Sequence, residues 1–305
     1  MSSAVVKQSS GRSAKISVAR LTDYWQLTKP RIAIMAMSAV AVGYILGGRG
    51  TFQAWEMASA CLGIFVVAVS CSLLNQCIEK DTDARMERTA DRPVATGRVR
   101  LGEALAAGLV TGLLGITWLW LTVNVLTAGL AAATLAVYVC AYTPMKRKSP
   151  CCTTIGAFAG ALPPVLGWTA AGSPLDAGAL ALFLLLFVWQ FPHFLAIATI
   201  YRRDYERAGL KMLPVLSSGR SCAGLISVIS AAVLIPFSLL AWHQGLTGDS
   251  YVLVAALAGS MYLLCSVRFV LEQSRRRARE LFLCSIVYLP TVLLTMIWEH
   301  CCLTA

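Results

Sequence analysis

The sequence predicts an all-α membrane protein, a bundle of nine transmembrane helices. Of its 305 residues, 57% are hydrophobic and only 13% carry a charge, and the mean hydropathy is +0.69. Its apolar segments are long enough to cross a hydrocarbon core of about 30 Å as helices. They do not alternate between apolar and polar positions, as the strands of a membrane barrel do. The composition therefore favours a helical bundle within a bilayer.

Nine apolar segments are the expected spans. Small residues recur in many of them, as in residues 104–108 and 156–160, and allow helices to approach closely within lipid. The start of the chain has scattered serine, lysine and arginine and no apolar stretch beside them, so we expect a disordered cytoplasmic tail at residues 1–22. One transmembrane domain would then occupy residues 23–305. The expected spans are residues 31–49, 55–77, 101–121, 123–143, 152–172, 176–200, 221–242, 250–270 and 281–299.

The basic residues predict the orientation of these spans. All but one of the 26 lysines and arginines fall near the N-terminus or in alternate loops, and only Arg49 lies on the opposite side. The positive-inside rule then places the N-terminus and the basic loops in the cytoplasm and the C-terminus in the periplasm of a bacterial inner membrane. The net charge of +11 follows from this topology, so we expect the lipid bilayer as a partner and no nucleic acid.

A polar stripe ends the second predicted span. Asn75, Glu79 and Asp83 are spaced by four residues, and at about 100° per residue such positions share one face of a helix. Two carboxylates and an amide oxygen suit Mg²⁺, which usually joins one or two carboxylates to phosphate oxygens. The stripe therefore predicts a magnesium and diphosphate site, and the alternative is an ordinary solvated loop.

Two basic elements lie on the same predicted side of the membrane. Arg88 and Arg92 follow the stripe directly, and guanidinium groups bind phosphate oxygens through two parallel hydrogen bonds. The second basic element is residues 146–148, in the loop between spans four and five. It could be a charge block that fixes the topology or a part of the same site. Stripe and arginines together predict one anion-binding region.

The sixth predicted span carries a second polar cluster. Gln190 and His193 lie inside this span, and His193 is about 12 Å from Tyr201 at its end. Polar side chains at such depth usually face the bundle interior or a watery cavity, and they mark functional sites. The alternative is a neutral histidine that bonds to a neighbouring helix. Asp204 follows in the next loop, again on the cytoplasmic side.

These elements together describe a central cavity that opens toward the cytoplasmic side. Three loops would bring amide, carboxylate and basic groups above a cavity whose wall holds Gln190 and His193. A diphosphate bound at this charged roof would leave a long apolar tail free to lie among the helices. The expected substrate class is therefore an isoprenyl diphosphate.

Seven blocks of sequence resemble, in order and nearly end to end, the UbiA superfamily of intramembrane prenyltransferases. Within it they are most similar to the subfamily that farnesylates protohaem IX to make haem O. Gln76 stands where many members that act on aromatic acids or quinone precursors carry Asp, and Glu79 replaces an Asp, which favours haem as the acceptor. The blocks are residues 23–31, 75–83, 86–93, 142–147, 160–168, 190–194 and 204–215.

The resemblance implies an enzyme that transfers farnesyl from farnesyl diphosphate to a vinyl group of haem B, with addition of water and with Mg²⁺ as cofactor. Haem A synthase and a terminal oxidase are the expected protein partners. Two alternatives stay open. One is a related prenyltransferase with a quinone or chlorin acceptor, and the other is a haem-binding membrane transporter.

The same resemblance implies roles for individual residues. The metal ligands would come from the polar stripe at the end of the second span and from the loop after the sixth span. Tyr205 would be a further catalytic residue. The implied metal ligands are Asn75, Glu79, Asp83 and Asp204; the implied diphosphate contacts are Arg88, Arg92, Lys146, Arg147 and Arg203; and the implied haem contacts are His193 and Gln190.

Overall fold

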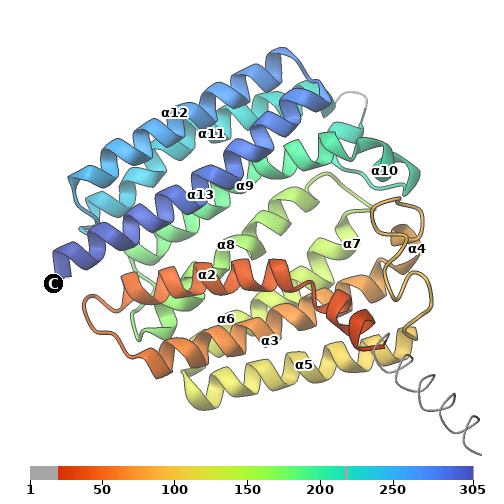
Figure 1. Ribbon diagram of the computed structural model, residues 1–305, viewed down its shortest axis with the longest axis horizontal. Coiled ribbons are helices and arrows are strands. Elements are labelled where there is room, and N and C mark those ends of the chain that lie inside the picture. Colours follow the sequence, from red (N-terminus) through yellow and green to blue (C-terminus); the bar gives the residue numbers. More distant parts are fainter. Residues whose placement is uncertain (1–19, 217–218, 305) are drawn as a thin grey trace, which may run out of the picture.

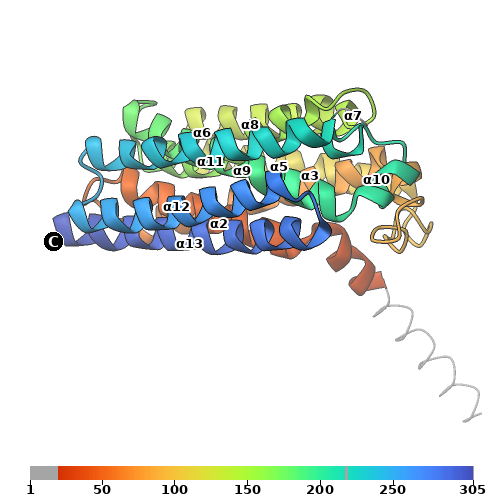
Figure 2. The same cartoon turned by 90° about the horizontal axis from the view of Figure 1, so that it is seen from above.

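Helices alone make up the regular structure of the residues described by this computed structural model, 20–216 and 219–304 (Figure 1). The long helices run along one common direction (Figure 2). They form two groups, and α8 (Cys152–Ala170) packs against both. One group is α2 (Pro30–Gly47), α3 (Ala54–Ile78), α5 (Leu101–Thr122) and α6 (Val125–Ala136), and the other is α9 (Ala177–Ile200), α11 (Gly219–His243), α12 (Asp249–Leu271) and α13 (Arg275–Thr304).

Eight helices in the described ranges are long and apolar enough to cross a membrane. They are α2, α3, α5, the continuous segment Val125–Met145, α9, α11, α12 and α13. Each coincides with one of the spans predicted from the sequence, and the agreement follows from their length and uninterrupted hydrophobicity. The chain is therefore a multi-pass membrane protein.

The remaining predicted span, the fifth in the chain, is α8, which is less apolar because it contains threonines, glycines and the pair Pro163 and Pro164. It lies inside the bundle, where 14 of its 19 residues are buried. Glycines bring α8 and α2 into backbone contact. A Cβ at Gly43 would lie 1.8 Å from the Pro164 carbonyl oxygen, and one at Gly167 would lie 1.9 Å from the Val40 carbonyl oxygen. Neither position therefore accepts a larger residue without separating the two helices.

The fourth predicted span does not wind evenly. It consists of α6, a π-helical turn at Val137–Tyr142 and the short helix α7 (Thr143–Met145). Single π-turns within α-helices are rare and often lie at functional sites. This turn comes directly before Thr143 and Lys146, which both contact the end of α3.

The short helices lie at one end of the bundle. Figure 1 shows α4 (Lys80–Asp83), α7 and α10 (Arg202–Arg207) at this end and the C-terminus at the other. We call it the loop end; it holds residues 79–100, 146–151, 201–216 and 272–274. At the opposite end Arg49 pairs with Asp176 at 2.6 Å, and the Asp176 carboxylate also caps α9 by accepting two backbone N–H groups.

Some boundaries differ from those the sequence predicts. Residues 20–22, the end of the predicted tail, belong to a helical segment that continues to residue 28, whereas the predicted tail at residues 1–19 lies outside the described residues. Helix α13 begins at Arg275, inside a predicted basic loop, because Glu280 pairs with Arg276 and Arg277 along the helix. The predicted loop after α9 contains α10 and a 3₁₀ turn at Leu213–Val215.

Candidate active site

The predicted stripe spans the end of one helix and the start of the next. Helix α3 ends at Ile78, and α4 covers Lys80–Asp83, so Glu79 lies at the junction. Asn75, Glu79 and Asp83 are all buried, with exposed fractions of 1%, 7% and 1% for the whole residues. Burial of two carboxylates requires partners, because an unpaired charge away from water is strongly unfavourable.

Each member of the stripe has a different basic partner. The Asn75 amide oxygen accepts a hydrogen bond from the Lys29 ammonium at 3.0 Å, and the Asn75 amide nitrogen donates to the Thr143 hydroxyl at 3.3 Å. Lys146 Nζ lies 2.7 Å from the Glu79 carboxylate. Arg92 Nη1 donates to both oxygens of Asp83 at 2.7 Å. We call these six residues, Asn75, Glu79, Asp83, Lys29, Lys146 and Arg92, the stripe site.

Charge pairing sets the protonation of the stripe site. Burial alone would raise the pKa of Glu79, but the Lys146 ammonium beside it holds that pKa below its usual range. Burial lowers the pKa of Lys146, whereas Tyr142 and Glu79 raise it, and the net pKa lies above the usual value. Burial and the nearby Arg92 lower the pKa of Lys29 to about 7. Glu79 and Lys146 are therefore a stable ion pair, and Lys29 is a weaker cation near neutral pH.

Sequence reasoning missed Lys29. This residue joins the first helical segment to α2 and adopts a left-handed backbone conformation, with φ of 46°, directly before Pro30. The segment before it is tied to the α4–α5 loop, because Arg98 donates to Asp23 at 2.8 Å and to Gln26 at 3.2 Å. The available signal was a lysine at the start of an apolar span, inside a block that resembles the family. Nothing in the local sequence indicated its partner, which lies 46 residues away.

The stripe site offers hard oxygen donors that fit a magnesium ion shared with phosphate oxygens. Two carboxylates and one amide oxygen match the ligand types that Mg²⁺ prefers, and Mg²⁺ needs only one or two carboxylates when a substrate phosphate completes its shell. Within the described ranges, no group of three or more His, Cys, Asp or Glu side chains is close enough to hold a metal ion. Glu79 and Asp83 are thus not joined by Asp204 in a single ready-made acidic cluster.

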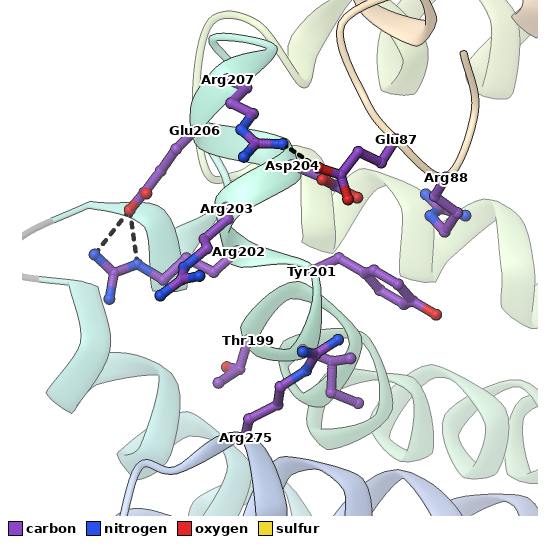
Figure 3. A pocket seen from close by; sticks show the side chains of 11 residues that line it. Glu87, Arg88, Thr199, Tyr201, Arg202, Arg203, Asp204, Glu206, Arg207 and Arg275 are labelled. Atoms are coloured by element: carbon purple, nitrogen blue, oxygen red, sulfur yellow. Dashed lines mark hydrogen bonds and ion pairs between the residues drawn. The ribbon is translucent and has the colours of Figure 1, made fainter.

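Asp204 instead lines an open cavity of about 910 Å³ at the loop end (Figure 3). The end of α9, the helix α10, the first residue of α13 and the α4–α5 loop enclose this space, which we call the arginine cavity. Arg88 lies with its guanidinium 5.0 Å from the centre of the Tyr201 ring. The lining residues are Glu87, Arg88, Thr199, Ile200, Tyr201, Arg202, Arg203, Asp204, Glu206, Arg207 and Arg275.

The predicted site residues therefore divide among different places. Arg92 and Lys146 join the stripe, whereas Arg88, Arg203 and Asp204 line the arginine cavity. Tyr205 packs against a small apolar cluster that includes Met86 and Ala198. Arg147 lies at a separate pocket of about 250 Å³ with Asp81 and Arg85, and it donates at 3.5 Å to the Ile78 carbonyl oxygen.

The two polar residues of α9 have different surroundings. Gln190 is 3% exposed, and its amide nitrogen donates to the carbonyl oxygens of Ala157 and Leu186 at 3.2 and 2.9 Å. A Cβ at Gly160 would lie 2.2 Å from the Gln190 amide oxygen, so this glycine makes room for it. These contacts favour a role for Gln190 in joining α8 to α9 over a role in binding a ligand.

His193 is held in the seam between α9 and α13. Its Nδ1 lies 2.7 Å from the Ser285 hydroxyl, and its ring stacks on Trp189 with a centroid distance of 4.8 Å. The ring centroid of Phe282, in α13, lies 5.2 Å from that of His193. The Ser285 contact fixes the ring orientation, and it leaves Nε2 as the nitrogen for any further ligand.

Comparison with known sequences identifies relatives over most of the chain. A model of the UbiA prenyltransferase family matches residues 36–289. The protoheme IX farnesyltransferase of Koribacter versatilis is 43% identical over 291 residues, which cover 92% of this chain and 94% of that protein. The protoheme IX farnesyltransferase of Solibacter usitatus is 42% identical over 282 residues, which cover 89% of this chain and 96% of that protein.

Solved structures share the fold at much lower identity. A digeranylgeranylglyceryl phosphate synthase structure matches with a TM-score of 0.76 and 16% identity over 92% of this chain and 99% of that one. A UbiA homologue from Archaeoglobus fulgidus bound to GPP and Mg²⁺ matches with a TM-score of 0.65 and 16% identity over 90% of this chain and 99% of that one. The helical arrangement is therefore common to these proteins.

Proposed function

The chain belongs to the UbiA prenyltransferase family, and from this premise we propose that it is a protohaem IX farnesyltransferase. It transfers the farnesyl group of farnesyl diphosphate to a vinyl group of haem B and forms haem O. The two relatives described above support this acceptor, because both carry that name and cover nearly the whole chain.

The proposed reaction forms one carbon–carbon bond and adds one water. The carbon–oxygen bond of farnesyl diphosphate breaks, and its electron pair leaves with the diphosphate. The vinyl group supplies two electrons to the allylic carbon, and the cation left beside the porphyrin ring takes the oxygen of water, which loses a proton. An apolar site within the bilayer keeps bulk water away from the first cation until the new bond has formed.

The single observation that carries this proposal is the composition of the stripe site. Two carboxylates and an amide oxygen can bind a metal ion there, and each is paired with a basic side chain that can bind a diphosphate. Mg²⁺, when bound, neutralises the charge that develops on the leaving diphosphate. Asn75, Glu79 and Asp83 would be the protein ligands of this ion. Lys29, Lys146 and Arg92 would then release the stripe and contact diphosphate oxygens, so each charge exchanges one partner for another.

Residues of α10, of the α4–α5 loop and of α9 complete the proposed site. Asp204 of α10 would supply a further metal ligand, and Arg88 would contact the diphosphate from the arginine cavity that both residues line. Tyr205 would act by positioning α10, since it packs against apolar residues. His193 would contact haem through Nε2, while Ser285 orients the ring.

The proposed location is the bacterial inner membrane, with the loop end in the cytoplasm. The basic residues of that end support this orientation. Haem O made there would pass to haem A synthase or to a terminal oxidase, which we propose as partners.

A competition assay tests the function. Membranes that contain the chain receive Mg²⁺, labelled farnesyl diphosphate, and equal amounts of haem B, a quinone precursor and a chlorin. We expect label only in a haem product whose mass has increased by a farnesyl group and a hydroxyl group, because the added water loses one proton. We expect no product with the Asp204→Asn variant. Label in the quinone or chlorin would overturn haem as acceptor, and haem uptake without any labelled product would favour a transporter.

A further inference from the structure

The arginine cavity has an excess of positive charge that its own acidic residues do not neutralise. Eight charged side chains line it. Arg202 pairs with Glu206 at 2.7 Å and Arg207 pairs with Glu87 at 2.5 Å, which accounts for four of them. The other four are Arg88, Arg203, Asp204 and Arg275, with a net charge of +2.

Arg203 and Arg275 are the arginines that are free for a ligand. Arg88 already lies over the Tyr201 ring, whereas Arg203 and Arg275 form no ion pair within the described part of the chain. Helix α13 begins with three arginines, and the second and third pair with Glu280 at 3.3 and 2.8 Å. Only the first, Arg275, lines the cavity, beside Thr199 and below Arg202 in Figure 3.

The cavity lies directly above the seam that holds His193. Helices α9 and α13 line the cavity with Thr199 and Arg275, and deeper in the membrane the same two helices meet at His193 and Ser285. At about 1.5 Å per residue, His193 lies roughly 12 Å below Tyr201 and Ser285 roughly 15 Å below Arg275. These lengths are comparable with the span of a porphyrin ring and its side chains.

Two aromatic side chains of α9 and α13 lie close to His193. Phe282 and Phe194 are half-buried, and their ring centroids lie 5.2 and 5.7 Å from that of His193. Flat aromatic rings suit a flat conjugated ligand, since such groups pack face to face or edge to face. A ligand with two carboxylates at one edge and a planar apolar body would match the cavity charge and the seam below it.

We propose that Arg203 and Arg275 bind the two propionate groups of haem B, with the porphyrin ring directed between α9 and α13 toward His193. This inference rests on the proposed function for the identity of the acceptor. It moves Arg203 from the diphosphate contacts to the haem contacts. Propionates held at the cavity would leave the Nε2 atom of His193 to bind the iron.

Haem titrations without farnesyl diphosphate test the proposal independently of catalysis. The purified full-length protein is titrated by absorbance with haem B and with its dimethyl ester, whose esterified propionates carry no charge. We expect the wild-type protein to bind haem B at least about tenfold more tightly than the ester, since charge-assisted hydrogen bonds to both arginines are lost. The Arg203→Gln/Arg275→Gln variant should lose that preference while its affinity for the ester stays within about twofold.

Arg276→Gln is the matched control, since Arg276 is adjacent in sequence, pairs with Glu280 and does not line the cavity. It should bind both haems like the wild type. Equal wild-type affinity for haem B and the ester would overturn the proposal. So would a double variant whose KM for farnesyl diphosphate rises while its haem affinity is unchanged, because the cavity would then bind diphosphate. Absence of farnesyl transfer would overturn the proposed function but would leave the titrations interpretable.

Discussion

Two charged regions share the loop end, and they handle charge in opposite ways. In the stripe site the paired side chains are enclosed, with exposed fractions of 22% and 1% for Arg92 and Asp83 and of 16% and 9% for Lys146 and Glu79. In the arginine cavity the pairs face water, with 56% and 77% for Arg207 and Glu87. The charges of the stripe site are buried and paired with one another, whereas those of the arginine cavity are accessible to a ligand.

The difference shows what each region must do to bind a substrate. Buried ions need a partner at all times, so the stripe site can accept a metal and a diphosphate only by exchanging its internal pairs. Among the described residues Arg203 and Arg275 have no ion pair to break, so they can bind an anion directly. Substitutions in the closed region should therefore affect stability and turnover together, whereas substitutions of Arg203 and Arg275 in the open region should affect binding alone.

Asp83→Asn should have the largest effect within the stripe site. The change removes one carboxylate from the proposed metal site and leaves the Arg92 guanidinium without its bidentate partner. Haem O formation in membranes should fall by at least about a hundredfold, the scale of losing a group that stabilises transition-state charge. Asp81→Asn is the control, because Asp81 is exposed and only two residues away. Equal activity of the two variants would remove Asp83 from the mechanism.

Variants of the Glu79 and Lys146 pair distinguish an effect on stability from an effect on turnover. Lys146→Met leaves a buried carboxylate unpaired, and we expect a loss of about 3 kcal/mol in the free energy of unfolding. The double variant Glu79→Gln/Lys146→Met should regain most of that stability, measured by thermal unfolding in detergent, because no lone charge remains. Its haem O production should stay as low as that of either single variant. Recovery of activity with stability would mean that the pair is only structural.

Lys29→Met should have an intermediate effect. Asn75 keeps its contact with Thr143 but loses the ammonium, so the amide oxygen is held less firmly and the diphosphate loses one cation. We expect kcat/KM for farnesyl diphosphate to fall about tenfold, as for one charge-assisted hydrogen bond. Arg31→Gln, on the exposed side of the same turn, should stay within about twofold of the wild type. Similar losses in both variants would indicate a general role of this turn and not of Lys29.

Glu87→Gln should have the smallest effect. Its partner Arg207 is largely exposed, and ion pairs in water contribute little to stability. We expect no measurable change in the thermal midpoint. A clear loss of stability would show that the arginine cavity is more enclosed than its exposed fractions indicate.

Most of the fold could be predicted from the sequence, because helices in lipid are specified by long apolar segments. The eight most apolar segments were all identified. The π-helical turn could not be predicted, since Val137–Tyr142 has the same apolar composition as the helix before it. The early start of α13 depends on ion pairs with Glu280 that a count of charges does not distinguish from a loop.

The candidate site could be predicted by residue type but not by pairing. Spacing identified Asn75, Glu79 and Asp83, since positions four apart share a helix face. The partners of Asn75 lie 46 and 68 residues away in the chain, and only the packing of α2 and α7 against α3 brings them together. For the same reason the sequence could not separate Arg147 from Lys146, although the structure directs them to different pockets.

The π-helical turn before α7 makes the stripe site sensitive to chain length. A π-turn has hydrogen bonds from residue i to residue i+5 and so contains one residue more than an α-helical turn. If the same residues wound as a regular α-helix, this extra residue would rotate everything after it by about 100°. Thr143 and Lys146 would then point away from Asn75 and Glu79, although every residue of the site would still be present. Deletion of one residue between 137 and 142 should therefore remove the π-turn and leave Thr143 and Lys146 facing α3, whereas deletion of two should turn both away from it.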